Sequence, residues 1–188
     1  MSAQYQKGDT IIEVVLAFAI FSAAAVGTIA LISSGLATTQ RNLEITLVRQ
    51  QIDSQAELLR FARDTGGPVW QSLINSPVTN PLPLSQSCSP VSGASQRFYV
   101  WPMIGATPDA TTLTRTGITS SSYAEPATYA KIDYGTGAAR SEGVWIETAV
   151  AATRPGAPRA YDFYIHACWD SVGVDTPMTL GTIVRIYE

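Results

Sequence analysis

The hydrophobic residues near the start of the chain form a long run without charge. From Val14 to Ile32 there are 19 residues with no charged side chain, and only Ser22, Gly27 and Thr28 interrupt the apolar character. At ~1.5 Å per residue this run is ~28 Å long as a helix, close to the ~30 Å hydrocarbon core of a bilayer. The pattern predicts a helical segment of membrane-spanning length.

The apolar residues that follow the run recur at helical spacing, with charged residues between them. Gly66-Gly67-Pro68 ends this periodicity, because glycine permits a left-handed C-terminal turn and proline blocks continuation. We therefore predict one helix from about Asp9 to Asp64, apolar all round in its first half and amphipathic in its second. The stripe of the second half consists of Leu36, Leu43, Leu47, Ile52, Ala56 and Leu59.

Alternating and β-branched segments follow the helix and predict strands. Residues 66–95 contain five prolines and are expected to form a long surface connection, and Thr107–Ser122 is expected to be a Thr/Ser-rich loop. One long helix followed by an antiparallel sheet is an α+β layout, with the sheet lying on the apolar stripe of the helix. The predicted strands are Arg97–Ile104, Tyr129–Tyr134, Gly143–Val150, Ala160–Trp169 and Leu180–Tyr187, the last two as a hairpin.

A lone carboxylate, Glu13, stands at the entrance to the apolar run. A charge among membrane-inserted residues costs ~2.5–3.5 kcal/mol at the bilayer centre and less near the end, so such a group normally has a partner. Lys7 lies on the far side of Gly8 and does not provide one locally. The position of Glu13 therefore indicates a partner outside its own helix.

At these residues the chain resembles a type IV prepilin with its N-terminal methylation-type leader. The resemblance rests on a basic residue, a glycine, a glutamate five positions later and a membrane-length apolar run. It implies that a prepilin peptidase cuts between Gly8 and Asp9, within the site Lys7-Gly8-Asp9. Glu13 then becomes the fifth mature residue and pairs with the α-amine of a neighbouring subunit. Asp9 stands where the family usually has phenylalanine.

The resemblance also implies how the chain is divided. Residues 1–8 would be the leader, 9–35 the transmembrane and filament-core half of the helix, 36–65 the amphipathic half, and 66–188 a β-rich head. Pilins commonly have a glycine or proline where the helix partly unwinds in the filament. Gly27 and Gly35 are the corresponding candidates for helix flexibility here, and close packing against another helix is the alternative for both.

The function implied is that of a structural subunit of a type IV pilus-like filament. Its partners would be identical or homologous subunits, the prepilin peptidase, the membrane and the pilus assembly machinery. The precursor would be single-pass in the cytoplasmic membrane, and the assembled filament would be at the cell surface. The alternatives are a pseudopilin of a secretion or DNA-uptake machine, a monomeric membrane-anchored binding module, and a secretory signal peptide cut near Ala23-Ala24-Ala25.

Charge and cysteine content narrow the possible partners. The net charge is −3, and the residues after Pro68 include 7 basic and 9 acidic side chains without a basic stripe, which argues against a dedicated nucleic-acid module. Cys88 and Cys168 are compatible with a disulfide in an oxidising compartment. Two buried free thiols are the alternative.

The residues that carry chemistry in enzymes are sparse. His166, the only histidine, shares an alternating strand face with Asp162 and Tyr164, and we interpret this as a polar face in contact with solvent. Ser171 is nearby but lacks the surroundings of a catalytic nucleophile. Two cysteines and one histidine are too few for a zinc site, and three of the four tryptophans are expected in the core. We therefore expect no enzymatic activity and no cofactor.

Overall fold

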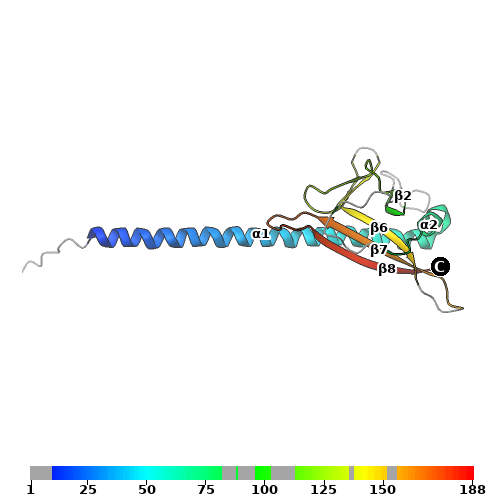
Figure 1. Ribbon diagram of the computed structural model, residues 1–188, viewed down its shortest axis with the longest axis horizontal. Helices are drawn as coiled ribbons and strands as arrows, with labels where there is room; N and C mark the ends of the chain where they lie inside the picture. The colour runs from blue at the N-terminus through cyan, green and yellow to red at the C-terminus, as the bar shows by residue number, and fades with distance from the viewer. Residues whose placement is uncertain (1–9, 82–87, 89–95, 103–112, 136–137, 152–155) are drawn as a thin grey trace, which may run out of the picture. The chain divides into compact units, whose positions relative to one another are not determined.

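The computed structural model describes residues 10–81, 88, 96–102, 113–135, 138–151 and 156–188. The chain divides into two compact units, Met1–Gln40 and Arg41–Glu188. The fold is α+β, with one long N-terminal helix and a five-stranded antiparallel sheet (Figure 1). The second half of the helix belongs to the same unit as the sheet.

Helix α1 spans Thr10–Thr65 and ends where the glycine pair was expected to end it. Gly66 and Gly67 have φ angles of +67° and +82°, which residues with a side chain rarely adopt. A second helix, α2 (Gly67–Ile74), follows at once, with proline in its first turn. The expectation of an irregular connection is wrong here, because Trp70, Leu73 and Ile74 share one buried helix face.

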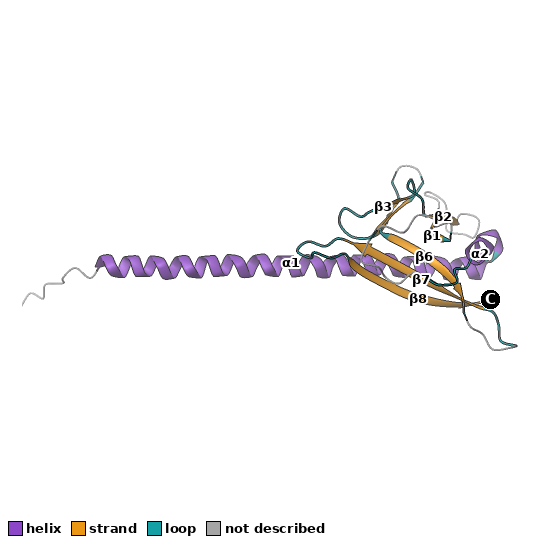
Figure 2. Cartoon of the chain, in the orientation of Figure 1, coloured by secondary structure: helices purple, strands orange, loops and turns teal. Residues whose placement is uncertain are grey.

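The main sheet has the strand order β2-β1-β6-β7-β8, and all neighbours are antiparallel. The predicted hairpin of β7 and β8 is confirmed, with ten residue pairs from Ala160↔Tyr187 to Trp169↔Met178. A small second sheet has the order β3-β5-β4 (Figure 2). The main strands are β1 (Arg97–Pro102), β2 (Leu113–Gly117), β6 (Val144–Val150), β7 (Ala160–Trp169) and β8 (Met178–Tyr187); the small ones are β3 (Tyr123–Ala124), β4 (Lys131–Asp133) and β5 (Arg140–Glu142).

Strand β2 corrects one expectation from the sequence. Its residues lie in the Thr/Ser-rich segment that was expected to be a loop. They pair with β1 over five positions, from Phe98↔Gly117 to Pro102↔Leu113. Threonine is β-branched and fits a half-buried strand well, so the hydroxyl content of the segment was a misleading signal.

One face of the main sheet packs with the second half of α1 in a single core. Alternate residues of each strand point to this face. The Gln55 side chain lies inside the core and satisfies both backbone groups of Val100, with Nε2 donating to the carbonyl at 2.8 Å and Oε1 accepting from the amide at 3.0 Å. The core includes Val48, Ile52, Leu59, Phe98, Val100, Ile146, Phe163 and Ile165.

The opposite face of the main sheet carries the disulfide. Cys88 and Cys168 are joined in a disulfide, with their Cα atoms 5.2 Å apart, so the two cysteines are not the free thiols that were the alternative. The Tyr123 hydroxyl donates to the Cys88 carbonyl, and the Tyr123 ring meets the Trp145 ring at 6.5 Å. Elements far apart in the sequence therefore cover part of this face.

Two expectations about buried residues were wrong or incomplete. His166 is 5% exposed and does not face solvent. All four tryptophans are buried, rather than three. The alternation that placed His166, Asp162 and Tyr164 on one strand face was correct, but this face is largely covered.

Candidate functional site

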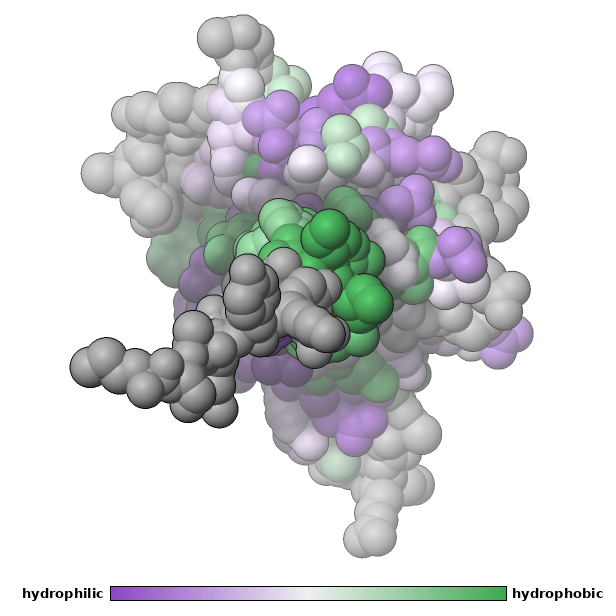
Figure 3. Space-filling view, turned by 90° about the vertical axis from the view of Figure 1, so that its left-hand side faces the viewer, coloured by the Kyte–Doolittle hydropathy of each residue, from purple (hydrophilic) through white to green (hydrophobic). Residues whose placement is uncertain are grey.

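The first half of α1 carries a continuous set of exposed hydrophobic side chains. Thirteen large apolar residues from Ile11 to Leu36 are between 54% and 76% exposed. In the second half of the same helix, Val48 and Leu59 are fully buried. Figure 3 shows strongly hydrophobic surface at the centre of the face turned to the viewer. This helix is long and apolar enough to cross a membrane.

The cost of leaving this surface in water is large. Burying one Val, Leu, Ile or Phe side chain contributes roughly 1.5–3 kcal/mol. Covering thirteen such side chains that are about two-thirds exposed contributes on the order of 15 kcal/mol or more. Because this exceeds the net stability of many domains, the segment requires an apolar environment such as lipid or other helices.

Three threonine hydroxyls in this segment are satisfied within the helix. The hydroxyls of Thr28, Thr38 and Thr39 donate to the carbonyls four residues earlier, at 2.8, 3.0 and 2.9 Å. An unsatisfied polar group in hydrocarbon costs several kcal/mol, so internal bonding of this kind suits a lipid or helix-packed environment. These three hydroxyls therefore need no partner outside the helix.

Glu13 lies in the first turn of α1 and is exposed. Within the described part of the chain, its carboxylate forms no hydrogen bond or ion pair. Ile11, Ile12, Val15, Leu16 and Ala19 form an open apolar hollow on the same turns. The positive end of the helix dipole supplies about 0.3–1 kcal/mol to such a group at an exposed site, well short of what a buried carboxylate requires.

The predicted leader residues Lys7, Gly8 and Asp9 lie outside the described residues, so processing after Gly8 stays a prediction. Gly27 and Gly35 lie inside α1, which continues through both. A Cβ atom added at either glycine meets nothing within 4 Å. The structure therefore leaves space for a close neighbour at each, and their flexibility also stays a prediction.

Glu44 is one of the charged residues that lie between the apolar positions of the helix, and its burial was not predicted from the sequence. The residue is 5% exposed, and its carboxylate accepts hydrogen bonds from Trp169 Nε1 at 3.1 Å and Ser171 Oγ at 2.6 Å. A signal was present, because Glu44 precedes the buried Val48 by four residues and Ile52 by eight. Its position in the buried stripe was therefore readable from helical spacing.

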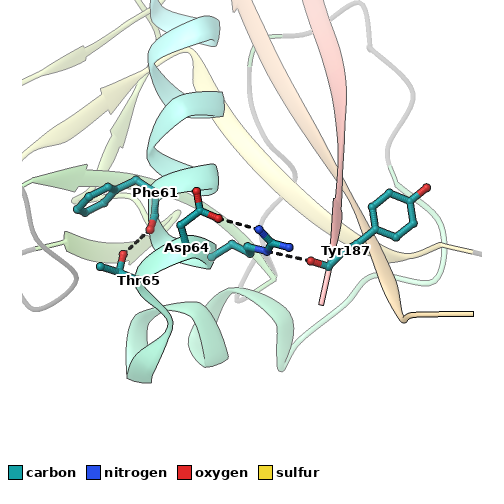
Figure 4. Close-up of polar contacts among 5 residues, drawn as sticks. Phe61, Asp64, Thr65 and Tyr187 are labelled. Carbon is teal, nitrogen blue, oxygen red and sulfur yellow. Dashed lines mark hydrogen bonds and ion pairs between the residues drawn. The ribbon is translucent and has the colours of Figure 1, made fainter.

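The other end of the buried half of α1 is also tied to the sheet (Figure 4). Arg63 Nε donates to the Tyr187 carbonyl at 3.0 Å, and its guanidinium pairs with Asp64 at 2.8 Å. The Thr65 hydroxyl donates back to the Phe61 carbonyl. Polar contacts thus hold this half of the helix near both of its ends.

The structure separates the residues that might have formed a catalytic pair. The Ser171 hydroxyl donates to Glu44 on the helix side of the sheet. His166 lies on the opposite face, stacked on Trp145 at 5.3 Å. Among the described residues, no group of three or more His, Cys, Asp or Glu side chains is arranged to hold a metal ion.

Comparisons with protein-family models, curated proteins and solved structures found no match for this chain. The long apolar N-terminal helix and the antiparallel sheet that packs on its second half are compatible with a pilin-like fold.

Proposed function

We propose that this chain is a structural subunit of a type IV pilus-like filament, polymerised through the first half of α1. The observation that carries the proposal is the division of one helix into a buried half and an uncovered apolar half that opens with a lone carboxylate. Lipid alone satisfies the apolar side chains. Lipid offers no charged partner for the Glu13 carboxylate, whereas an interface with another subunit can supply one.

In the proposed filament, Glu13 meets the α-amine that cleavage after Gly8 creates on a neighbouring subunit. Two unit charges 4 Å apart attract by ~4 kcal/mol at an effective dielectric of 20 and by ~1 kcal/mol in water. The gain therefore arises mainly on docking, after the subunit has left the lipid. The same pairing fixes the register between neighbouring helices.

The partners follow from this arrangement. They are identical or homologous subunits, a prepilin peptidase, the cytoplasmic membrane that stores the subunit, and the assembly machinery. The disulfide between Cys88 and Cys168 fits a head on the oxidising side of that membrane.

The test compares wild type with Glu13→Gln in a host that assembles such filaments. Glutamine matches glutamate in size but carries no charge, so insertion and cleavage should be unchanged. We expect mature wild-type protein to begin at Asp9 and to appear in sheared fibres, whereas Glu13→Gln remains in the membrane. Thr46→Ser, on the same helix within the head, serves as a control that should assemble normally. A normal yield of Glu13→Gln fibres contradicts the proposal, and a mature N-terminus near Val26 indicates a signal peptide instead.

A further inference from the structure

The pairing between β1 and β6, which we call the joint, is the shortest in the main sheet. It has two residue pairs, Arg97↔Glu147 and Phe98↔Ile146, whereas β1–β2 has five, β6–β7 seven and β7–β8 ten. Beyond Phe98, the backbone of Val100 bonds to Gln55 of α1 instead of to β6. The β1–β2 hairpin therefore joins the rest of the sheet through few backbone hydrogen bonds, and side chains must supply much of the attachment.

An ion pair between described residues crosses this joint. Arg97 Nε lies 2.6 Å from Glu147 Oε1, and the two side chains are 13% and 2% exposed. Losing one partner of such a buried pair strongly destabilises the fold, because the other charge is left uncompensated. The joint thus depends on a carboxylate that holds one buried cation.

His166 borders the same carboxylate. Its Nε2 lies 3.7 Å from Glu147 Oε2, and neither ring nitrogen has a hydrogen-bond partner among the residues that the structure describes. The imidazole stacks on Trp145 at 5.3 Å and on Tyr164 at 6.4 Å. Burial lowers the pKa of His166 below its ordinary value of 6.5; Glu147 opposes this shift and Arg97 adds to it. The side chain is therefore neutral at pH 7.

Among the groups that face His166 from the described strands, Glu147 is the carboxylate that can pair with a protonated imidazole. Arg97 of β1 is cationic, and Tyr164 lies on the same strand. The register partner on β8 is Gly181, which has no charge. Farther along, Arg185 holds Asp162 through two hydrogen bonds of 2.7 Å, so this second carboxylate is engaged elsewhere.

We propose that the joint between β1 and β6 is an acid-sensitive hinge and that His166 is its proton sensor. Protonation places a second buried cation beside the first, and both compete for Glu147. The β1–β2 hairpin then opens before the rest of the sheet. This inference concerns the head alone and does not depend on filament formation.

The direction of the pH effect follows from linkage. In the open joint, Arg97 has moved away with β1 while Glu147 remains beside His166, so the pKa of His166 is higher than in the closed joint. Opening therefore binds a proton, and the closed state loses stability as the pH falls below the higher pKa of the open joint. The opening constant should rise by at most about tenfold per pH unit, until the lower pKa of the closed state is passed.

The test is amide hydrogen exchange of the full chain in detergent micelles between pH 7.5 and 5.5, corrected for intrinsic exchange rates. We expect β1 and β2 to lose protection on acidification while β7 and β8 keep theirs. His166→Phe keeps a stacked ring without a titrating group, so protection of its β1–β2 hairpin should not change with pH. Equal acid sensitivity in His166→Phe, parallel loss in β7–β8, or no loss in wild type overturns the proposal.

A second measurement needs no variant. Because the chain has one histidine, its imidazole gives a single set of NMR signals in the wild-type protein. We expect these signals to titrate with a midpoint below 6.5, with the amides of Arg97 and Phe98 shifting at the same midpoint. A midpoint at or above 6.5, or strand amides that do not follow it, overturns the proposal even if His166→Phe fails to fold.

Discussion

Replacing Gln55 by leucine tests how far a single side chain attaches β1 to the helix. Gln55 is 1% exposed, and its side-chain amide bonds to both backbone groups of Val100. Leucine has nearly the same volume, so the packing is kept while both backbone groups lose their partner. A buried donor or acceptor without a partner costs about 1–3 kcal/mol. We therefore expect Gln55→Leu to lower the free energy of unfolding by roughly 2–5 kcal/mol.

The assay is denaturant unfolding of the full chain in micelles, followed by tryptophan fluorescence, because all four tryptophans are buried in the head. Gln50 is exposed on the same helix, so Gln50→Leu is the matched control and should change stability by less than about 0.5 kcal/mol. If the free energy of unfolding of Gln55→Leu lies within that margin of the wild-type value, the reasoning is refuted, since water or a shifted strand must then bond to the backbone of Val100.

Two further substitutions test the packing around the disulfide and the helix. At Gly143 the φ angle is +77° and an added Cβ lies 2.3 Å from the Cys168 carbonyl oxygen, so Gly143→Ala should destabilise the head by at least about 3 kcal/mol in the same assay. Gly173→Ala is its control, because φ is +76° but nothing lies within 4 Å, and an equal loss in both variants would exclude the clash as the cause. Glu44→Leu leaves the Trp169 indole and the Ser171 hydroxyl without this acceptor and should cost about 2–4 kcal/mol. Exposed Glu57→Leu should cost little by comparison, and equal effects would show that the Glu44 contacts contribute nothing.

Long, strongly patterned elements were predictable from the sequence. The helix was expected at Asp9–Asp64 and spans Thr10–Thr65, because an uninterrupted periodic run with a glycine stop has few alternatives. The strand Ala160–Trp169 was placed correctly, since it is rich in aromatic and β-branched residues. The short strands β3 and β5 were missed because strands of two or three residues form by tertiary pairing rather than by local preference.

Burial of polar residues was harder to predict than secondary structure. His166 was placed on the correct face of its strand, but the cover of that face includes Cys88 and Tyr123, which are distant in the sequence. Glu44 was counted among the charged residues between the apolar positions, but it is buried four residues before Val48. Glu13 was recognisable for the opposite reason, because a charge stands out at the edge of an uncharged run. The sequence therefore identified the candidate assembly residue more readily than the residues that stabilise the head.

The polar contacts of the head restrict how a filament of this chain can assemble. Glu44, Gln55 and Arg63 bind the second half of α1 to Trp169, Val100 and Tyr187. Releasing this half from its sheet would break all three attachments and uncover the apolar core around Leu59. The large side chains of the first half are exposed. In the proposed filament, subunits therefore join through the first half of α1 while each head keeps its own second half, so substitutions that loosen the head should lower its stability without changing the register that Glu13 sets.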